Sequence, residues 1–322
     1  GRLADIGRAV VAEKVARPPG ERLRRWLLAH ALTSRGLFAA ALALGRAARP
    51  LLPGRLARRI PERRAPRATP PARHARRMVV LGGCVQPSIA PSINAAAARV
   101  LDRLGIALVD VASAGCCGAV PFHLDYQRDA LAFVKANIDA WWPEVEAGAG
   151  AIVVTASGCG TMVKDYGHLL RDDPAYAQKA RRVSELARDV SEVVAGEHEA
   201  LVALLRAAPK AAAKPRAVAF HSPCSLQHGQ KIQGVVESIL REAGFALTPV
   251  PDAHLCCGSA GTYSILQPAL SRRLLQDKVR ALESGGPELV ATANVGCLAH
   301  LESGLSRPVV HWIELLDERL GG

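Results

Sequence analysis

The sequence lacks any long hydrophobic run. The longest one in the first part of the chain covers residues 37–44, whereas a helix needs roughly 20 apolar residues to cross a bilayer. The N-terminus also lacks the charged, apolar and small-residue order of a secretion signal, because residues 1–5 (Gly-Arg-Leu-Ala-Asp) already look like the middle of a longer segment. No transmembrane helix is expected, and we predict a cytoplasmic protein.

Several motifs of common enzymes are also missing. The sequence contains no G-x-G-x-x-G after a predicted strand, no G-x-x-x-x-G-K-[ST] and no H-E-x-x-H. The chain thus lacks the usual signs of nucleotide, flavin or metalloprotease chemistry of its own. If it carries electrons, another protein must supply them.

Cysteine is sparse, with eight residues in a chain of 322. This count is too low for a disulfide-dense secreted scaffold, and without a secretion signal the thiols are expected to stay reduced. Reduced cysteines that occur in clusters indicate metal binding.

Positive charge is concentrated in the first part of the chain. Residues 1–77 hold 19 Lys and Arg against 4 Asp and Glu, a net +15, whereas residues 78–322 hold 22 against 25, a net −3. Such a basic segment fits an acidic partner or an anionic membrane surface. No nucleic-acid-binding motif accompanies it, so we expect no nucleic-acid partner.

The eight cysteines form two sets of four with nearly equal spacing, and each set has two adjacent cysteines before a glycine. The first gap is 32 residues in both sets, and the last is 42 residues in one and 40 in the other. The sets are Cys84, Cys116, Cys117 and Cys159, and Cys224, Cys256, Cys257 and Cys297. A repeat of about 140 residues indicates a duplicated domain, since solenoid units are roughly 20 to 50 residues long.

Within each copy, short β-rich runs alternate with helical stretches. In the first copy we predict strands at 78–81, 107–111 and 151–154 and helices at 90–104 and 125–142. In the second we predict strands at 217–220, 245–250 and 289–292 and helices at 229–243 and 268–282. The pattern predicts an α/β fold of two duplicated Rossmann-like β-α-β-α-β domains with parallel sheets, in which every cysteine group follows the carboxyl end of a strand.

Two stretches rich in Pro and Arg, 60–77 and 206–216, are interpreted as linkers. They divide the chain into a basic helical segment with its linker (1–77), a first cysteine-rich domain (78–205) and a second (216–322). In the first segment apolar residues recur at helical spacing, but there is too little core for it to stand alone. These residues are Leu23, Trp26, Leu27 and His30.

Four thiolates suit an iron–sulfur cluster or Zn²⁺ far better than calcium or magnesium. Two adjacent residues reach one tetrahedral ion only with strain, whereas a cluster offers separate irons, so the adjacent pairs favour a cluster. A zinc site in one of the two copies, and thiol–disulfide redox chemistry at the adjacent pairs, are the alternatives.

Glycines next to the cysteines are expected to let the backbone approach the cofactor and to supply N–H donors. They are Gly118, Gly158, Gly258 and Gly296. His300, three residues after Cys297, is the best candidate for a further ligand, whereas Met162 at the equivalent place is expected in the core. The other nearby histidines are expected to bond locally or to tune the clusters without ligating them: His123, His221, His228 and His254.

Several longer stretches carry a family resemblance. They are Gly158-Cys159-Gly160, 137–143 (Asn-Ile-Asp-Ala-Trp-Trp-Pro), 254–263 (His-Leu-Cys-Cys-Gly-Ser-Ala-Gly-Thr-Tyr) and 311–314 (His-Trp-Ile-Glu). The chain resembles the duplicated cysteine-rich CCG-domain family, whose members occur in heterodisulfide reductases, anaerobic glycerol-3-phosphate dehydrogenases and lactate-utilisation proteins. It is most similar to the iron–sulfur subunits of bacterial glycolate oxidases (glycolate dehydrogenases).

The resemblance implies an electron-transfer subunit of an oxidoreductase complex, with one iron–sulfur cluster, of the [4Fe–4S] type, in each domain. A flavoprotein (FAD-binding) dehydrogenase subunit would oxidise glycolate, and electrons would pass through this chain toward the quinone pool. The basic segment would then contact the flavoprotein or the inner face of the plasma membrane. The alternatives are a zinc-stabilised scaffold without redox function and a heterodisulfide-reductase-like enzyme acting on thiols.

Two features depart from the family pattern. Full-length members begin with a ferredoxin-like region that holds two C-x-x-C-x-x-C-x-x-x-C-P runs, which this sequence does not contain, so we expect a truncated chain. Some CCG domains end in C-x-x-C, whereas Met162 and His300 stand at that place here. This excludes a five-cysteine site of the heterodisulfide type.

Overall fold

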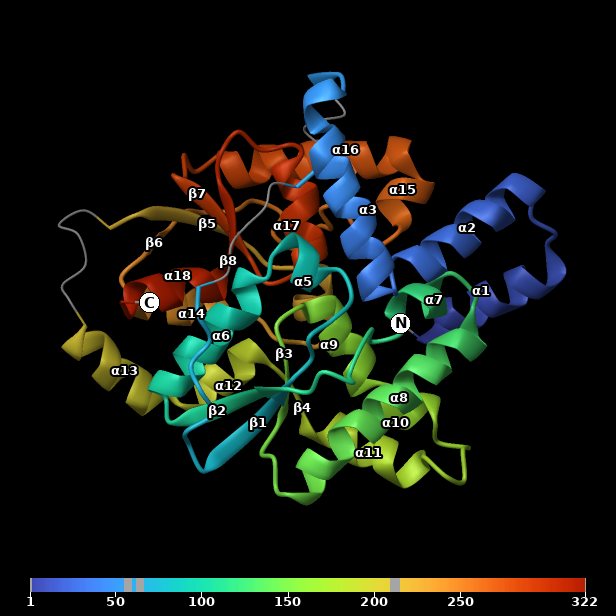
Figure 1. Ribbon diagram of the computed structural model, residues 1–322. Helices are drawn as coiled ribbons and strands as arrows, with labels where there is room; N and C mark the ends of the chain where they lie inside the picture. Colours follow the sequence, from blue (N-terminus) through green and yellow to red (C-terminus); the bar gives the residue numbers. More distant parts are fainter. Residues whose placement is uncertain (1, 55–59, 62–66, 209–214, 322) are drawn as a thin grey trace.

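The computed structural model describes residues 2–54, 60–61, 67–208 and 215–321. They form two α/β units preceded by three helices, with the first unit drawn in teal through green to yellow and the second in orange to red (Figure 1). Parts of both predicted linkers, 62–66 and 209–214, lie outside the described residues.

The strands of the first unit are β1 (Arg76–Val80), β2 (Ile106–Asp110), β3 (Ile152–Val154) and β4 (Ala187–Asp189), and those of the second are β5 (Ala217–His221), β6 (Ala246–Leu247), β7 (Leu289–Thr292) and β8 (Val309–His311). The N-terminal helices are α1 (Arg2–Lys14), α2 (Pro19–Ala31), α3 (Arg35–Ala48) and the 3₁₀ turn η1 (Arg49–Leu51). The helices of the first unit are α5 (Gln86–Ile89), α6 (Ser92–Arg103), α7 (Ala119–His123), α8 (Gln127–Glu146), α9 (Ser157–Lys164), α10 (Tyr166–Leu169), α11 (Ala177–Leu186), α12 (Val190–Gly196) and α13 (His198–Ala207). Those of the second are the π-helical turn η2 (Ser225–Gly229), α14 (Val235–Glu242), α15 (Tyr263–Leu266), α16 (Pro268–Glu283), α17 (Val295–Glu302) and α18 (Trp312–Arg319).

Both sheets are parallel and have the same strand order, β2-β1-β3-β4 and β6-β5-β7-β8. The chain leaves the central strand (β1 or β5) toward one edge and returns to its other side. The direction in which strands are added to the sheet therefore reverses between β1 and β3, and likewise between β5 and β7. Open α/β sheets bind ligands at this point, beyond the carboxyl ends of the strands. The predicted α/β fold with duplicated parallel sheets is confirmed.

Each sheet carries a fourth strand that the sequence pattern did not predict. β4 and β8 are three residues long, and each is followed at once by a helix that begins with a capping box. Runs this short give little periodicity to detect. In the second unit α14 begins six residues later than expected, because Gly234 in the left-handed conformation (φ +75°) precedes it.

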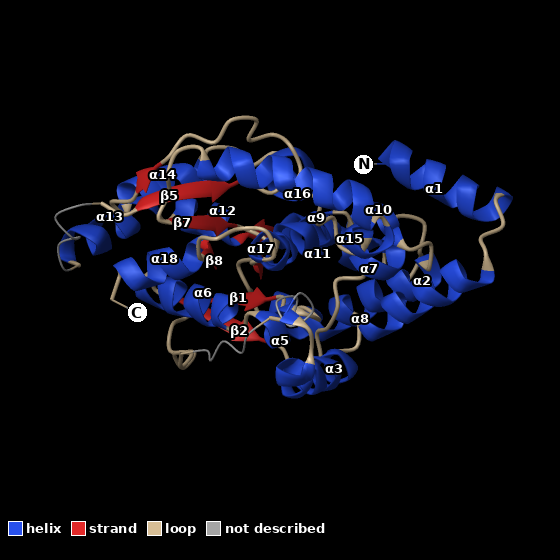
Figure 2. Ribbon diagram, turned by 90° about the horizontal axis from the view of Figure 1, so that it is seen from above, coloured by secondary structure: helices blue, strands red, loops and turns tan. Residues whose placement is uncertain are grey.

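Hydrophobic side chains form two clusters, and one of them belongs to both units. Ile152 and Val154 point into a cluster confined to the first unit, whereas Val153 points the other way, into a cluster that also contains Val290 and Leu316. Helices α6 and α18 pack together between the two sheets (Figure 2). The two copies therefore share a core.

Polar contacts join the two units as well. The Arg99 guanidinium binds the Asp317 carboxylate through Nη2 at 2.6 Å and Nε at 3.1 Å. His311, at the start of α18, lies fully buried with its Nε2 2.9 Å from the carbonyl oxygen of Thr155 in the first unit. His311 Nδ1 accepts a hydrogen bond from the Ile313 amide and so caps α18.

The N-terminal helices lie against the first unit, and arginines hold them there. Arg17 pairs with Asp125 at 2.6 Å, and Arg35 Nε donates to the carbonyl oxygen of Gly83 at 2.6 Å, next to Cys84. Part of the basic excess of residues 1–77 is thus neutralised inside this chain. Among the described residues, no single helix is long and apolar enough to cross a membrane. Only α2 and residues 35–51 taken together have the length and composition of a membrane span, and they are bent by 103° relative to each other.

Burial of His311 predicts a pH-dependent stability. Burial lowers the pKa of His311 from 6.5 to about 4, so the unfolded chain takes up the proton first as the pH falls. The stabilisation is present above pH 6.5 and is lost toward pH 4, by about 3 kcal/mol. His311→Asn keeps a good capping residue, and in this variant the part of the decrease in unfolding free energy that His311 causes should vanish. Urea unfolding at pH 6.5 and pH 4 measures the decrease in both proteins.

Comparing the unsubstituted protein with His311→Asn cancels the effects of other titrating groups on the free energy of unfolding. Burial raises the pKa of Asp189 to about 6 and acts in the opposite direction, but it does so in both proteins. Parallel stability curves for the two proteins would contradict the prediction.

Candidate metal centres

The cysteines of the first set lie at the carboxyl ends of three neighbouring strands. Cys84 follows β1, the Cys116-Cys117 pair follows β2, and Cys159 lies in the first turn of α9 after β3. The second set repeats the arrangement: Cys224 follows β5, the Cys256-Cys257 pair follows β6, and Cys297 lies in the first turn of α17 after β7. All eight are free thiols.

Each set of thiols converges. In the second set the Sγ atoms of Cys224 and Cys256 are 4.0 Å apart, and those of Cys257 and Cys297 lie within 4.8 Å of each other. In the first set Cys84 contacts Cys116, which contacts Cys117, and Cys117 contacts Cys159. Most of these side chains are buried, with Cys116 and Cys257 each 1% exposed. Cysteines that are distant in sequence therefore meet in the fold, while their role as metal ligands stays a prediction.

Crowding and burial oppose ionisation of these thiols. The contact with Cys116, together with burial, raises the pKa of Cys84, and the contact with Cys117 raises that of Cys116. In the second set the hydrogen bond to Cys256 raises the pKa of Cys224 and lowers that of Cys256, which accepts it. Four thiolates can coexist here only when positive charge compensates them. The donor set therefore fits a metal ion or an iron–sulfur cluster.

The glycine after each cysteine pair has a defined structural role. Gly118 (φ +86°) donates its N–H to Cys116 Sγ at 3.4 Å, and Gly258 (φ +89°) donates to Cys256 Sγ at 3.3 Å. A Cβ atom at Gly258 would lie 2.5 Å from the carbonyl oxygen of Ser271 in α16, and one at Gly118 would lie 2.9 Å from that of Ala130 in α8. Glycine is therefore required at both positions because the backbone there passes close to a helix.

The other two glycines lie where the two sets of cysteines come together. The Gly158 amide, next to Cys159, donates to Asn294 Oδ1 at 3.4 Å, and Asn294 Nδ2 donates to Cys297 Sγ at 3.3 Å. The carbonyl oxygen of Gly296 accepts from Ser259 Oγ at 2.8 Å. Asn294 therefore bridges the first cysteine set and the second, a role that the sequence analysis did not identify.

Buried polar side chains of the first unit hold its cysteine pair. Asn137 Nδ2 donates to the carbonyl oxygen of Cys116 at 2.7 Å, and its Oδ1 accepts from the Gly115 amide at 2.8 Å. Tyr166 donates its hydroxyl to the carbonyl oxygen of Cys117 at 2.9 Å. These contacts are long-range in sequence, so no local motif could predict them.

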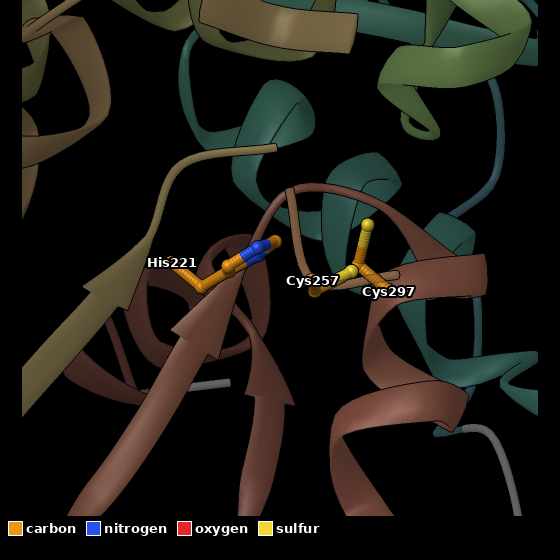
Figure 3. A group of neighbouring side chains, drawn as sticks. All are labelled: His221, Cys257 and Cys297. Carbon is orange, nitrogen blue, oxygen red and sulfur yellow. The ribbon is translucent and has the colours of Figure 1, made fainter. Parts of the chain in front are cut away.

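The structure separates the histidines that the sequence singled out. His300 is half-buried and its Nε2 lies 3.2 Å from Ser271 Oγ, outside the group formed by Cys257, Cys297 and His221, whose ligand atoms lie within 4.8 Å of one another (Figure 3). His228 Nε2 lies 3.1 Å from the carbonyl oxygen of His254, 26 residues away in the sequence, so this bond is not the local one expected. Met162 is in the core, 6% exposed, which confirms its prediction.

The family model of the CCG cysteine-rich domain matches residues 78–164 and 218–302, once in each unit. The chain therefore belongs to the CCG cysteine-rich domain family. It is 50% identical over 319 residues to the glycolate oxidase iron-sulfur subunit of Escherichia coli (strain K12), and the match covers 99% of this chain and 76% of that protein. The resemblance inferred from the sequence is confirmed.

More distant relatives share the same region. Lactate utilization protein A of Bacillus pumilus is 27% identical over 243 residues, 73% of this chain and 97% of that protein. The probable glycolate oxidase iron-sulfur subunit of Bacillus subtilis is 28% identical over 257 residues, 76% of this chain and 55% of that protein. The matched ranges fall inside the two predicted domains, and the domain boundaries themselves stay a prediction.

The close approach at Gly258 predicts a large cost of substitution. Gly258→Ala places a side chain at positive φ, at a cost of roughly 1–2 kcal/mol, and drives it into the Ser271 carbonyl, for a total of about 3 kcal/mol or more. The matched control is Gly286→Ala, which also has positive φ (+62°) but nothing within 4 Å. Guanidinium unfolding midpoints of the two variants measure the difference, and equal losses would show that no clash exists.

Proposed function

We propose that this chain is the iron–sulfur electron-transfer subunit of a complex that oxidises glycolate or a related 2-hydroxy acid. In this proposal each cysteine set holds one iron–sulfur centre, with Gly118, Gly158, Gly258 and Gly296 close to the centres. The observation that carries it is the convergence of two equivalent sets of four thiols at the carboxyl ends of two sheets. The 50% identity to a glycolate oxidase iron-sulfur subunit supports the choice of complex.

A [4Fe–4S] cluster in each unit fits the donors best, because adjacent cysteines can each reach a different iron. When bound, such a cluster accepts and releases one electron at a time. The chain itself supplies the ligands, excludes water by burying them, and directs amide donors of Gly118 and Gly258 at sulfur. Donors of this kind favour the more negatively charged, reduced state of a centre.

The interface between the units offers a short connection between the two centres. Asn294 contacts Cys297 directly and reaches Cys159 through the Gly158 amide. Ser157 Oγ and Ser225 Oγ, from the two units, lie 2.8 Å apart beside it. The two units share a hydrophobic cluster, so the fold would set the spacing of the centres. Both centres then serve as relay sites, and substrate oxidation takes place on a partner subunit.

The N-terminal helices offer a surface for that partner. Apolar side chains of α1 and α2 are exposed there, among them Ile6 (62%), Leu23 (59%) and Leu27 (50%), between arginines. Such a surface suits a flavoprotein subunit, which would deliver electrons from FAD, or the inner face of the plasma membrane, where quinone accepts them. The proposal is therefore of a cytoplasmic protein that lies in part at the membrane.

A zinc-stabilised scaffold is the second candidate, and one distance favours it. Thiolates on one zinc ion with Zn–S bonds of about 2.3 Å lie roughly 3.8 Å apart, close to the 4.0 Å between Cys224 and Cys256. Metal analysis distinguishes this candidate from the iron–sulfur proposal.

The iron–sulfur proposal predicts the metal content. Anaerobically purified protein should be brown, should bleach with dithionite, and should hold about eight iron and eight sulfide per chain when both centres are [4Fe–4S]. Cys257→Ser should reduce both values by about half. Elemental analysis and absorption spectra give the answer, and a colourless chain with zinc alone would exclude the iron–sulfur function.

The proposed docking surface predicts a second, separate result. Leu23→Glu with Leu27→Glu should weaken binding to the flavoprotein roughly tenfold or more, since each buried leucine contributes about 1.5–3 kcal/mol. Glycolate-dependent dye reduction by the reconstituted complex should fall in parallel, with iron content unchanged. The control Leu270→Glu alters an equally exposed leucine (53%) on α16. Equal effects of the two variants would place the partner elsewhere.

A further inference from the structure

His221 is a buried side chain with one ring nitrogen that has no partner among the described residues. It ends β5, is 2% exposed, and lies opposite Thr292 in the register of β5 and β7. Its Nδ1 lies 2.9 Å from Thr292 Oγ1, whereas Nε2 makes no hydrogen bond within the part of the chain that the structure describes. A polar atom buried without a partner is destabilising, so a hydrogen-bond partner is expected for it.

The ring belongs to the second cysteine set. One of its nitrogens lies within 4.8 Å of the thiols of Cys257 and Cys297, and Figure 3 shows the imidazole reaching from the strand end toward them. Because Nδ1 is engaged by Thr292, Nε2 is the nitrogen with a missing partner. The sulfur atoms of the proposed centre would lie on that side.

The first unit has no counterpart of this pair at the matching positions, both of which the structure describes. Leu81 precedes Cys84 by three residues, as His221 precedes Cys224, and is equally buried at 3% exposed. Val80 pairs with Val153, so Val154 stands opposite Leu81 where Thr292 stands opposite His221. The second copy thus has a polar pair where the first copy has an apolar pair. The common fold does not require a histidine at position 221, because leucine fills the equivalent place in the first copy.

Hydrogen-bond accounting assigns the ring proton. Thr292 is completely buried, and the ring nitrogen of His221 is the one partner of its hydroxyl among the described residues. The hydroxyl proton is used only when Thr292 donates to Nδ1. Since Nδ1 accepts this bond, the ring carries its proton on Nε2. Four cysteines already provide one ligand for each iron of a [4Fe–4S] cluster. His221 would therefore meet the cluster as a hydrogen-bond donor and not as a fifth ligand.

We propose that His221 donates a hydrogen bond from Nε2 to a sulfur atom of the second centre and thereby raises the reduction potential of that centre. The inference rests on the proposed iron–sulfur function. An N–H dipole directed at sulfur stabilises the extra negative charge of the reduced cluster, and the effect is strong where water is excluded. His221 is thus a positioning residue that tunes the centre and does not ligate iron.

The test is a redox titration of the second centre alone, in the full chain. Cys117→Ser serves as the background, because it disables the first centre. There, His221→Leu, which introduces the residue of the first unit, should keep the iron content and shift the midpoint potential of the second centre to a more negative value. His221→Gln restores an N–H donor near the place of Nε2 and should recover most of the shift. In a Cys257→Ser background, which retains only the first centre, His221→Leu should leave the potential unchanged.

Other outcomes overturn the inference in distinguishable ways. An unchanged potential in His221→Leu with full iron content would show that the ring does not act on the centre. Loss of iron in both variants, with altered electron paramagnetic resonance of what is left, would make His221 a ligand or a structural support. An unsubstituted chain that holds no iron–sulfur cluster would remove the proposed function and this inference together.

Discussion

Each cysteine set packs four sulfur atoms into a space from which water is largely excluded, and four thiolates there would repel one another strongly. Burial and mutual contact raise the pKa values of Cys84, Cys116 and Cys224, so the full donor set forms only around compensating positive charge. Parallel sheets make this arrangement feasible, because they bring several strand ends to one edge. The left-handed glycines after the cysteine pairs, Gly118 and Gly258, let the backbone pass close to a helix there and direct an amide at a cysteine sulfur.

Duplication produced two similar sites in different surroundings. The first pair of cysteines is held by Asn137 and Tyr166, whereas the second has His221 nearby and an amide contact from Asn294. Hydrogen bonds and burial are the means by which a protein adjusts the potential of an iron–sulfur centre. If each cysteine set holds a centre as proposed, the two centres would therefore differ in potential although their ligands are equal. The two cysteine sets belong to units that share a hydrophobic core.

The N-terminal helices connect this site to the outside. Arg35 reaches the loop just before Cys84, while apolar residues of α1 and α2 are exposed elsewhere on the same segment. The basic excess seen in the sequence is thus divided between internal pairs, such as Arg17 with Asp125, and the exposed surface. Charge counts alone give no such division, since they do not show which arginines find an acid in the fold.

The order of residues was enough to predict the duplicated α/β architecture, the two cysteine sets and their place after strands, because hydrophobic periodicity and repeated spacing are local signals. Strands β4 and β8 became visible only in the folded chain, since they are too short to show a period. The fold also revealed that the Ser271 carbonyl requires Gly258, that Asn294 joins the two sets, and that Nε2 of His221 lacks a partner among the described residues. These facts depend on atoms brought together from distant parts of the chain, and the spacing of residues along a sequence carries no record of such distances.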